Sequence, residues 1–531
     1  MRVLSGLIAI FLAVSKLTAE TIIVTDADVD GDVVWTASNE YILEGKVFVE
    51  EGESLTIEPG TVIKGAFSED GINASALVVA RGGKIFAEGT AEAPIIFTSE
   101  LDDVSDGTDL TSVDKGLWGG VIILGKAVIN SPVTEGQGVN TDNIEGLDPI
   151  TEPRGIFGGD DDEDNSGVMR YVSIRHGGAV IGANNEINGL TLGAVGRGTT
   201  IEFVEVFANL DDGIEFFGGT VNTRYIVSAF CGDDAFDYDQ GFRGLGQFWF
   251  VIQDSEGDNA GEHDGDIGTN DLLPISNPTI FNATYIGAGA DSGASQNVFR
   301  IRDNAGSKYY NSIFTDFGGI GLRVDDDGAT RVSEGDVVIS DNLWWAFGGG
   351  ESLDAITNEN AKSLIGEGTN NQFIDPALGG ISRDSDGGLD PRPSADSPAR
   401  GYGRAEEANG FFQDVDFAGA FGEVNWAASW TALGQANILS QEGAGIPDYP
   451  VADETKVLSE IPSVEYSYNA DLRSMTLSVI TEEGFAYQLQ RTEAVTGEWT
   501  EVGGPVIGSG QTINFGVIIE PGSRFFRVVV Q

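Results

Sequence analysis

Thr200-Ile-Glu-Phe-Val-Glu-Val-Phe-Ala-Asn-Leu-Asp-Asp-Gly-Ile-Glu-Phe-Phe217 is followed, at a step of 22 residues, by Asn222-Thr-Arg-Tyr-Ile-Val-Ser-Ala-Phe-Cys-Gly-Asp-Asp-Ala-Phe-Asp-Tyr-Asp239. In this alignment Phe203 falls on Tyr225, and Asp211-Asp212 falls on Asp233-Asp234. A repeat of this length cannot bury its own apolar side chains, so successive repeats must stack. The β-branched and aromatic runs predict an all-β fold, a right-handed parallel β-helix with about 22 residues per coil.

The same step recurs near the N-terminus. There Leu55-Thr-Ile-Glu-Pro-Gly-Thr-Val-Ile precedes Leu77-Val-Val-Ala-Arg-Gly-Gly-Lys-Ile by 22 residues. This second match predicts that Leu55 lies beside Leu77 on neighbouring coils, with Gly60 beside Gly82 and Ile63 beside Ile85.

The charge balance limits the function classes. Asp and Glu outnumber Lys and Arg by 84 to 29, for a net charge of −55. Such a charge repels nucleic acid and anionic membrane surfaces, and it favours the binding of cations. The single cysteine, Cys231, excludes an internal disulfide, and two histidines are too few for a multi-histidine metal site.

The chain divides into four parts. Residues 1–19 have a basic start, a short apolar run and small residues before Glu20, which predicts a secretory signal and a secreted, extracellular or cell-surface protein without a transmembrane segment. Residues 20–436 are expected to form the β-helix, with 373–436 as an irregular cap over its open end. Residues 437–459 form a polar linker, and 460–531 offer short strands that predict a small antiparallel β-sandwich.

Several motifs carry a family resemblance: Leu77-Val-Val-Ala-Arg-Gly-Gly, Trp118-Gly-Gly-Val-Ile-Ile-Leu-Gly, Asp212-Gly-Ile-Glu-Phe-Phe-Gly-Gly, Gly387-Gly-Leu-Asp-Pro-Arg-Pro, and Gly419-Ala-Phe-Gly with Trp426 and Trp430. In these motifs the chain resembles large secreted right-handed β-helix proteins of environmental Gram-negative bacteria. The resemblance implies an extracellular or cell-surface protein, and that family has no single activity.

Acidic clusters are the candidate metal ligands. If the two central repeats stack, Asp211 and Asp212 face Asp233 and Asp234 across about 4.8 Å, and their repulsion favours a bound cation. Hard oxygen ligands point to Ca²⁺. Two flexible acidic turns are further candidates, and their ligands would be Asp160, Asp162, Asp164, Asp384, Asp386 and Asp390.

A catalytic alternative comes from a resemblance to polygalacturonases, β-helix enzymes that place Asn-x-Asp, Asp-Asp, Gly-His-Gly and Arg-Ile-Lys along one face. This chain has Asn209-Leu-Asp211, Asp233-Asp234, Glu262-His263-Asp264 and Arg300-Ile-Arg302 in that order. The resemblance implies that Asp234 is the general acid, that Asp211 and Asp233 activate water, and that His263, Arg300 and Arg302 hold a sugar acid. Acidic residues flank His263 in place of glycines, and Arg302 stands in place of the lysine.

Two classes of function therefore stay open. The first is a non-enzymatic surface protein that is adhesive or binds glycans, cell-surface components or cations. The second is a glycoside hydrolase, or a polysaccharide lyase, that acts on an extracellular polysaccharide.

Overall fold

A computed structural model describes residues 20–530, apart from 69–73, 132–139, 148–149, 151, 183–184, 266–271, 326, 405–410, 448–463, 470–473, 482–484, 493–499, 502–505, 508–511 and 519–524. The expected signal sequence lies outside the described residues, as does most of the expected linker. No helix in the described part of the chain is long and apolar enough to cross a membrane.

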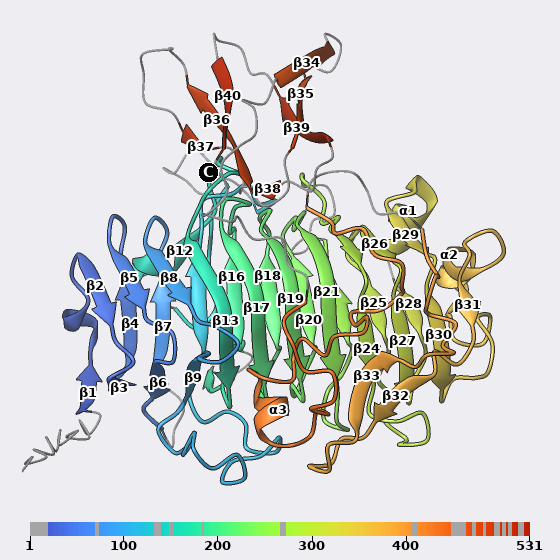
Figure 1. Ribbon diagram of the computed structural model, residues 1–531, viewed down its shortest axis with the longest axis horizontal. Coiled ribbons are helices and arrows are strands. Elements are labelled where there is room, and N and C mark those ends of the chain that lie inside the picture. Colours follow the sequence, from blue (N-terminus) through green and yellow to red (C-terminus); the bar gives the residue numbers. More distant parts are fainter. Residues whose placement is uncertain are drawn as a thin grey trace, which may run out of the picture.

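Parallel strands stack in register along the molecule and confirm the parallel β-helix (Figure 1). One sheet has nine strands, in the order β4 (Lys46–Val49), β7 (Ala76–Val79), β10 (Val121–Leu124), β16 (Leu190–Gly193), β18 (Ile214–Phe217), β20 (Phe236–Asp239), β22 (Gly261–His263), β25 (Phe299–Ile301) and β28 (Leu322–Val324). We call it the nine-stranded sheet.

The other walls form a continuous sheet of 18 strands. Its members are β1 (Glu20–Val24), β2 (Asp32–Trp35), β3 (Asn39–Leu43), β5 (Ser54–Ile57), β6 (Val62–Gly65), β8 (Lys84–Glu88), β9 (Ile95–Ser99), β13 (Gly167–Arg175), β17 (Thr200–Phe207), β19 (Asn222–Ala229), β21 (Leu245–Ile252), β23 (Thr279–Phe281), β24 (Thr284–Ile286), β26 (Ser307–Tyr310), β27 (Ile313–Phe317), β29 (Val337–Ser340), β30 (Leu343–Phe347) and β31 (Gln372–Phe373).

The central repeat is confirmed in register. Thr200 of β17 pairs with Asn222 of β19, and Ile214 of β18 pairs with Phe236 of β20. The two copies of the 22-residue unit therefore belong to adjacent coils.

The N-terminal alignment is wrong. Leu55 on β5 pairs with Val33 and Ile85 in the 18-stranded sheet, whereas Leu77 on β7 pairs with Val47 and with a residue of β10 in the nine-stranded sheet. A loop between β6 and β7 lengthens this coil, so Val47 and its partner Leu77 stand 30 residues apart. The expected matches of Gly60 with Gly82 and of Ile63 with Ile85 fail for the same reason. The sequence alignment rested on similar turn residues that belong to two different walls of the β-helix.

Short elements close the C-terminal end of the β-helix. After α1 (Gly328–Glu334), residues from η3 (Glu359–Ala361) and α2 (Lys362–Ile365) join the interior hydrophobic cluster, where Ile356, Ala361, Leu364 and Ile365 are buried. They cover the apolar interior that the last coils would otherwise expose.

The segment expected to cap that end lies elsewhere. Residues 374–445, here called the strap, include β32 (Leu378–Ile381), β33 (Leu389–Pro393) and α3 (Ala432–Gln435), and they run back along the outside of the 18-stranded sheet (Figure 1). Ile438 and Leu439, which follow the expected boundary at residue 436, are also buried in this contact, and the division into domains stays a prediction.

An aromatic ladder is the surface that the strap covers. The rings of Tyr171, Phe203, Tyr225 and Phe248 come from successive coils, with centroids 4.4, 4.4 and 4.7 Å apart. Each residue has a positive φ between 49° and 59°, a conformation that is costly for an L-residue with a bulky side chain. Trp426 of the strap packs edge-on against this ladder.

A buried carboxylate fixes the strap in place. Glu205 of β17 is fully buried, and it accepts hydrogen bonds from the backbone N–H groups of Ala432 (2.6 Å) and Leu433 (3.2 Å) and from Ser173 Oγ (2.5 Å). Since a buried carboxylate is tolerated only when its oxygens are hydrogen-bonded, Glu205 ties α3 to this one position on the sheet.

The C-terminal strands are antiparallel. β34 (Val464–Asn469), β35 (Ser474–Ile480) and β39 (Thr512–Ile518) form one sheet, and β36 (Ala486–Thr492), β37 (Thr500–Glu501), β38 (Val506–Ile507) and β40 (Phe525–Val530) form another. Val479 of the first sheet and Tyr487 of the second share a small apolar cluster. A sandwich of the two sheets stays a prediction.

Trp430 gives a test of the strap. Its ring is 1% exposed and lies edge-on to Tyr171 and Phe203, so Trp430→Ala should lower the free energy of unfolding by about 3–5 kcal/mol. Denaturant unfolding followed by circular dichroism measures the change. Trp345→Ala, at a ring that is 37% exposed, is the control, and an equal loss in both variants would contradict the docking of the strap.

Candidate metal centre

Charged side chains form a row on the outside of the nine-stranded sheet. Strand register places Glu215 beside Asp237, Asp237 beside Glu262, Glu262 beside Arg300, and Arg300 beside Arg323. Three carboxylates thus stack on consecutive coils before the row changes to guanidinium groups.

A second row lies in the turns that lead into these strands. Asp212 Oδ1 accepts a hydrogen bond from the backbone N–H of Asp234 (2.9 Å), and Asp234 Oδ1 accepts one from the backbone N–H of Asn259 (2.5 Å). Both aspartates are buried. Each therefore supports the backbone of the next coil with one oxygen.

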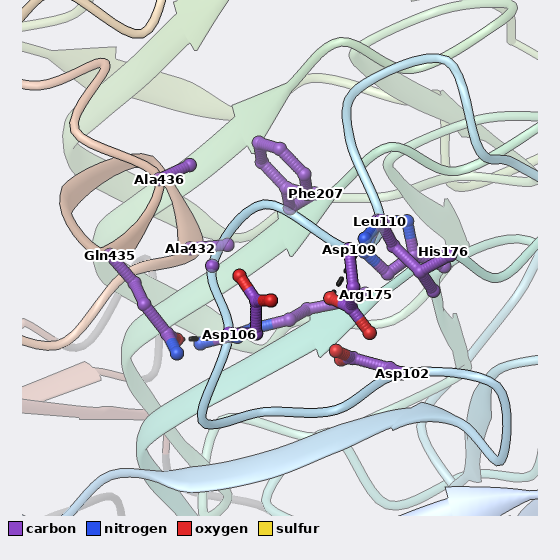
Figure 2. Close-up of a pocket in the computed structure, with 11 residues that line it drawn as sticks. Asp102, Asp106, Asp109, Leu110, Arg175, His176, Phe207, Ala432, Gln435 and Ala436 are labelled. Carbon is purple, nitrogen blue, oxygen red and sulfur yellow. Dashed lines mark hydrogen bonds between the residues drawn. The ribbon is translucent and has the colours of Figure 1, made fainter.

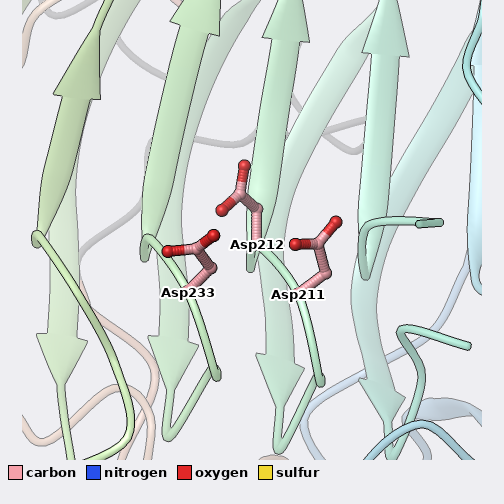
Figure 3. Close-up of side chains that lie close together, drawn as sticks. All are labelled: Asp211, Asp212 and Asp233. Carbon is pink, nitrogen blue, oxygen red and sulfur yellow. The ribbon is translucent and has the colours of Figure 1, made fainter. Parts of the chain in front are cut away.

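The two rows bring carboxylate oxygens together in three overlapping groups, in each of which the ligand atoms lie within 4.8 Å of one another. Figure 3 shows the group that neighbouring turns contribute, in which Asp212 lies between Asp211 and Asp233. The other groups are Asp212, Glu215 and Asp237, and Asp233, Asp234 and Asp258. The stacking of the predicted aspartates is therefore present.

The group of Asp212, Glu215 and Asp237 is the best candidate. Asp212 and Glu215 are each 8% exposed, and Asp237 Oδ1 is a buried oxygen that has no hydrogen-bond partner. In the described part of the chain no Lys or Arg nitrogen lies within 4.0 Å of these three carboxylates. The only side-chain donor to Glu215 there is the Asn188 amide.

Burial makes ionisation of this group unfavourable. The pKa of Asp212, of Glu215 and of Asp237 is raised well above the usual range, first by burial and then by the neighbouring carboxylates of the same group. Two unit charges 4.8 Å apart repel by about 3.5 kcal/mol at an effective dielectric constant near 20. A divalent cation would remove both penalties.

The polygalacturonase-like arrangement is not formed. His263 points into the β-helix, where it is fully buried and stacks on Tyr238 with ring centroids 4.3 Å apart. Burial lowers the pKa of its imidazole to about 3. Because alternate residues of a strand face opposite sides, His263 lies inside while its neighbours Glu262 and Asp264 lie outside, and it cannot touch a substrate.

The two arginines of that arrangement bind carboxylates of the protein. Arg300 pairs with Glu262 (3.1 Å) and Asp325 (3.3 Å), and Arg302 pairs with Glu262 (2.7 Å) and Asp264 (2.8 Å). The hydrogen bond to Asp264 raises the pKa of Arg302, and the protein's own acids occupy the groups that the resemblance assigned to a sugar acid. Asp211, Asp233 and Asp234 do lie on one side of the β-helix, but Asp234 is only 4% exposed.

In the two acidic turns the structure brings no three described carboxylates together, and calcium there stays a prediction. Asp162 pairs with Arg243 (3.0 Å), and in the described residues its neighbours Asp160 and Asp164 do not join it in a group of converging ligand atoms. Asp390 pairs with Arg392 (2.8 Å), and Asp386 accepts the backbone N–H of Gly388. Asp384 likewise converges with no other described carboxylates. Arg243, Arg392 and a local turn hydrogen bond thus engage the carboxylates of Asp162, Asp390 and Asp386.

Glu215 and Asp237 are the candidate ligands that sequence reasoning missed. Their signal is present in the central repeat, where an acid follows the second aspartate by three residues in both copies: Asp212-Gly-Ile-Glu215 and Asp234-Ala-Phe-Asp237. Alternation along β18 and β20 puts these two acids outside, on the same face.

A separate small pocket lies between the strap and the loop before β10 (Figure 2). Arg175 crosses it and donates to Gln435 Oε1 and Ser173 Oγ, both at 2.8 Å. The loop aspartates of the pocket include Asp106 and Asp109, which accept hydrogen bonds within their own loop. This pocket joins the strap to the β-helix and is not a metal centre.

The family comparison agrees with this architecture. The chain belongs to the family of pectate-lyase-like β-helix domains, whose model matches residues 27–371. The crystal structure of pectate lyase Pel9A is similar, with a TM-score of 0.31 and 13% identity over 70% of this chain and 88% of that chain. The Streptococcus pneumoniae surface protein and adhesin PfbA has a TM-score of 0.20 and 9% identity over 61% of this chain and 86% of that chain. No curated protein sequence matches.

The raised pKa values predict the pH dependence of stability in a chelator. Folded Asp212, Glu215 and Asp237 hold protons more tightly than the unfolded chain, so their contribution to stability is fully present below the ordinary carboxyl pKa of about 4. It is lost as the pH rises toward the raised values. Asp237→Asn removes one such group, so its stability relative to wild type should increase between pH 4 and pH 7. Urea unfolding in EDTA measures this difference. A difference that is independent of pH would show that Asp237 does not have a raised pKa.

Proposed function

We propose that this protein is exported and acts at an outer cell surface as a calcium-dependent binding protein that is not an enzyme. The observation that carries the proposal is the convergence of Asp212, Glu215 and Asp237, three carboxylates with ligand atoms within 4.8 Å and no nearby Lys or Arg in the described residues. That distance is about twice a Ca²⁺–oxygen bond of roughly 2.4 Å, and so the oxygens can meet one ion.

The identity of the cation follows from the ligands. All of them are hard oxygens, and carboxylates in several orientations suit the variable geometry of Ca²⁺. Mg²⁺ needs near-ideal octahedral geometry and keeps several waters, so a crowded set of carboxylates suits it less well. Adjacent carboxylates, among them part-exposed Asp211 and exposed Asp233, extend the acidic surface to the solvent.

The partner we propose is an acidic polysaccharide or another anionic cell-surface component. A chain with a net charge of −55 repels such partners by itself. A calcium ion that keeps open coordination positions would bridge protein and glycan carboxylates, and this makes binding depend on calcium.

The alternative of hydrolysis or lyase chemistry has less support. A catalytic set needs an accessible acid or base beside the scissile bond. His263 is in the interior, Asp234 is nearly covered, and Arg300 and Arg302 are engaged in ion pairs. The described residues offer no complete set on the acidic surface.

Calcium should therefore stabilise the protein. Saturation at 100 times the dissociation constant adds about 2.7 kcal/mol to the free energy of unfolding. We expect the melting temperature to fall in EDTA and to recover with Ca²⁺ more than with Mg²⁺. Asp237→Asn and Glu215→Gln should lose most of this response, whereas Asp384→Asn, at an acid that converges with no other described carboxylates, should keep it. Identical melting curves of the wild type in calcium and in chelator would refute the proposal.

One experiment distinguishes the binding of a polysaccharide from its cleavage. Wild type and Asp237→Asn are incubated with a panel of acidic and neutral polysaccharides, with and without calcium, and co-sedimentation and the release of reducing or unsaturated sugar ends are measured. We expect calcium-dependent retention on acidic polysaccharides without product. Product release that Asp234→Asn abolishes would establish an enzyme instead.

A further inference from the structure

Asn188 occupies the position on its own coil that corresponds to Asp212 on the next coil. It lies in the turn between β15 (Asn185–Glu186) and β16, two residues before β16, just as Asp212 lies two residues before the paired strand β18. The Gly189 backbone N–H donates to the Asp212 carbonyl oxygen (3.1 Å), so the two turns are in contact. Asn188 is 2% exposed. It is therefore a buried amide beside the candidate calcium site.

The corresponding residues of later coils use their side-chain oxygens within the protein. Asp212 Oδ1 and Asp234 Oδ1 each accept a backbone N–H of the next coil, at 2.9 and 2.5 Å. Strand register continues this row with Asn259 and Asn297. Asn259 Oδ1 accepts from Asn297 Nδ2 (3.0 Å), and Asn297 Oδ1 accepts a backbone N–H of the next coil (3.2 Å). Asn188 Oδ1 differs, because it is buried and has no hydrogen-bond partner among the described residues, although such groups normally have one.

The unpaired oxygen lies close to the carboxylates of the site. Asn188 Nδ2 donates a hydrogen bond to Glu215 Oε2. The nitrogen and oxygen of one amide are only about 2.3 Å apart, so Asn188 Oδ1 lies at most about 5 Å from that Glu215 oxygen. Turning the amide over would bring the two oxygens into contact. The amide nitrogen suits an ionised carboxylate alone, whereas the amide oxygen suits a carboxylate that shares a cation with it.

We propose that Asn188 binds the cation of this site through Oδ1, as a neutral fourth protein ligand beside Asp212, Glu215 and Asp237. The inference rests on the proposed function. Asparagine oxygens are ligands that Ca²⁺ takes in proteins, and Ca²⁺ accepts about six to eight oxygens. An amide supplies one of them without adding negative charge, whereas a fourth carboxylate would increase the repulsion within the group. Positions for water and for a glycan carboxylate stay open.

Two substitutions of Asn188 separate its oxygen from its donor. Asn188→Ala removes both and should weaken calcium binding at least about tenfold. An ionised aspartate supplies an oxygen but cannot donate to Glu215, so Asn188→Asp should bind calcium at least as tightly as wild type. Asn297→Ala is the control and should leave the affinity unchanged, because both polar atoms of the Asn297 amide are bonded within the protein. Calorimetric titration of the full chain with calcium measures each dissociation constant.

The number of waters on the bound ion distinguishes a ligand from a residue that only orients Glu215. Eu³⁺ is a hard cation that binds to oxygen ligands, and its luminescence lifetimes in H₂O and in D₂O report how many waters it keeps. The Eu³⁺ component that Asp237→Asn removes belongs to this site. In Asn188→Ala this component should gain about one water, which takes the place of the amide oxygen, and in Asn188→Asp and Asn297→Ala it should gain none.

Each contrary result has a definite meaning. Calcium binding that is lost in Asp237→Asn but equal to wild type in Asn188→Ala would overturn the inference and leave the proposed function standing. If alanine and aspartate at position 188 weaken binding equally and the water count does not change, Asn188 is only a donor to Glu215 and the inference is wrong. A wild type that binds no calcium would refute the proposed function and the inference with it. If Asn188→Ala does not fold, Asn188→Asp decides alone, because loss of calcium binding there contradicts the role of an oxygen ligand.

Discussion

The close spacing of stacked coils is the constraint on which the rest of this structure depends. Neighbouring parallel strands lie about 4.8 Å apart, so every outward side chain meets its counterpart on the next coil. For the rings of Tyr171, Phe203, Tyr225 and Phe248 this spacing is favourable, and they stack at 4.4 to 4.7 Å. For carboxylates the same spacing is unfavourable, and their mutual repulsion adds to burial, the main cause of the raised pKa values of Asp212, Glu215 and Asp237.

The strap exists because the aromatic ladder would otherwise face water. Residues with positive φ interrupt β13, β17, β19 and β21 at the same place in each coil, and each one turns a large ring outward. A stripe of exposed rings is an association surface, and the strap covers it with Trp426, Trp430 and Leu433. Glu205 then selects one position of the strap, since only there do backbone N–H groups satisfy its buried oxygens.

Sequence alone predicted the coil and its central register, because a repeat of identical length aligns residues that must stack. The predicted pairing of Leu55 with Leu77 failed, because similar glycine-containing turns occur in two different walls of the β-helix. Such turns do not show that extra residues separate two strands. Sequence reasoning also placed His263 wrongly on the outer face of the β-helix. Alternate residues of a strand face opposite sides, and the motif match did not take into account that His263 faces the interior. Asp211, Asp212, Asp233 and Asp234 were found through the repeat, whereas Glu215 and Asp237 needed the strand register to place them on the same face. Asp162 pairs with Arg243, which is far from it in the sequence, so local spacing could not reveal this ion pair. Asp390 pairs with its near neighbour Arg392.

The contrast between the two halves of the charged row shows which of its acids have an arginine partner among the described residues. From Glu262 onward each acid has an arginine partner: Glu262 and Asp264 pair with arginines of the next coil, and Asp325 pairs with Arg323 of its own coil. One coil earlier the same geometry presents Glu215 and Asp237 without any such partner in the described residues. Since the chain could place arginine in one coil and did not in the other, crowding of carboxylates is not simply a by-product of an acidic composition. At Asp212, Glu215 and Asp237 the repulsion is relieved either by protonation, which their raised pKa values favour, or by the cation that we propose.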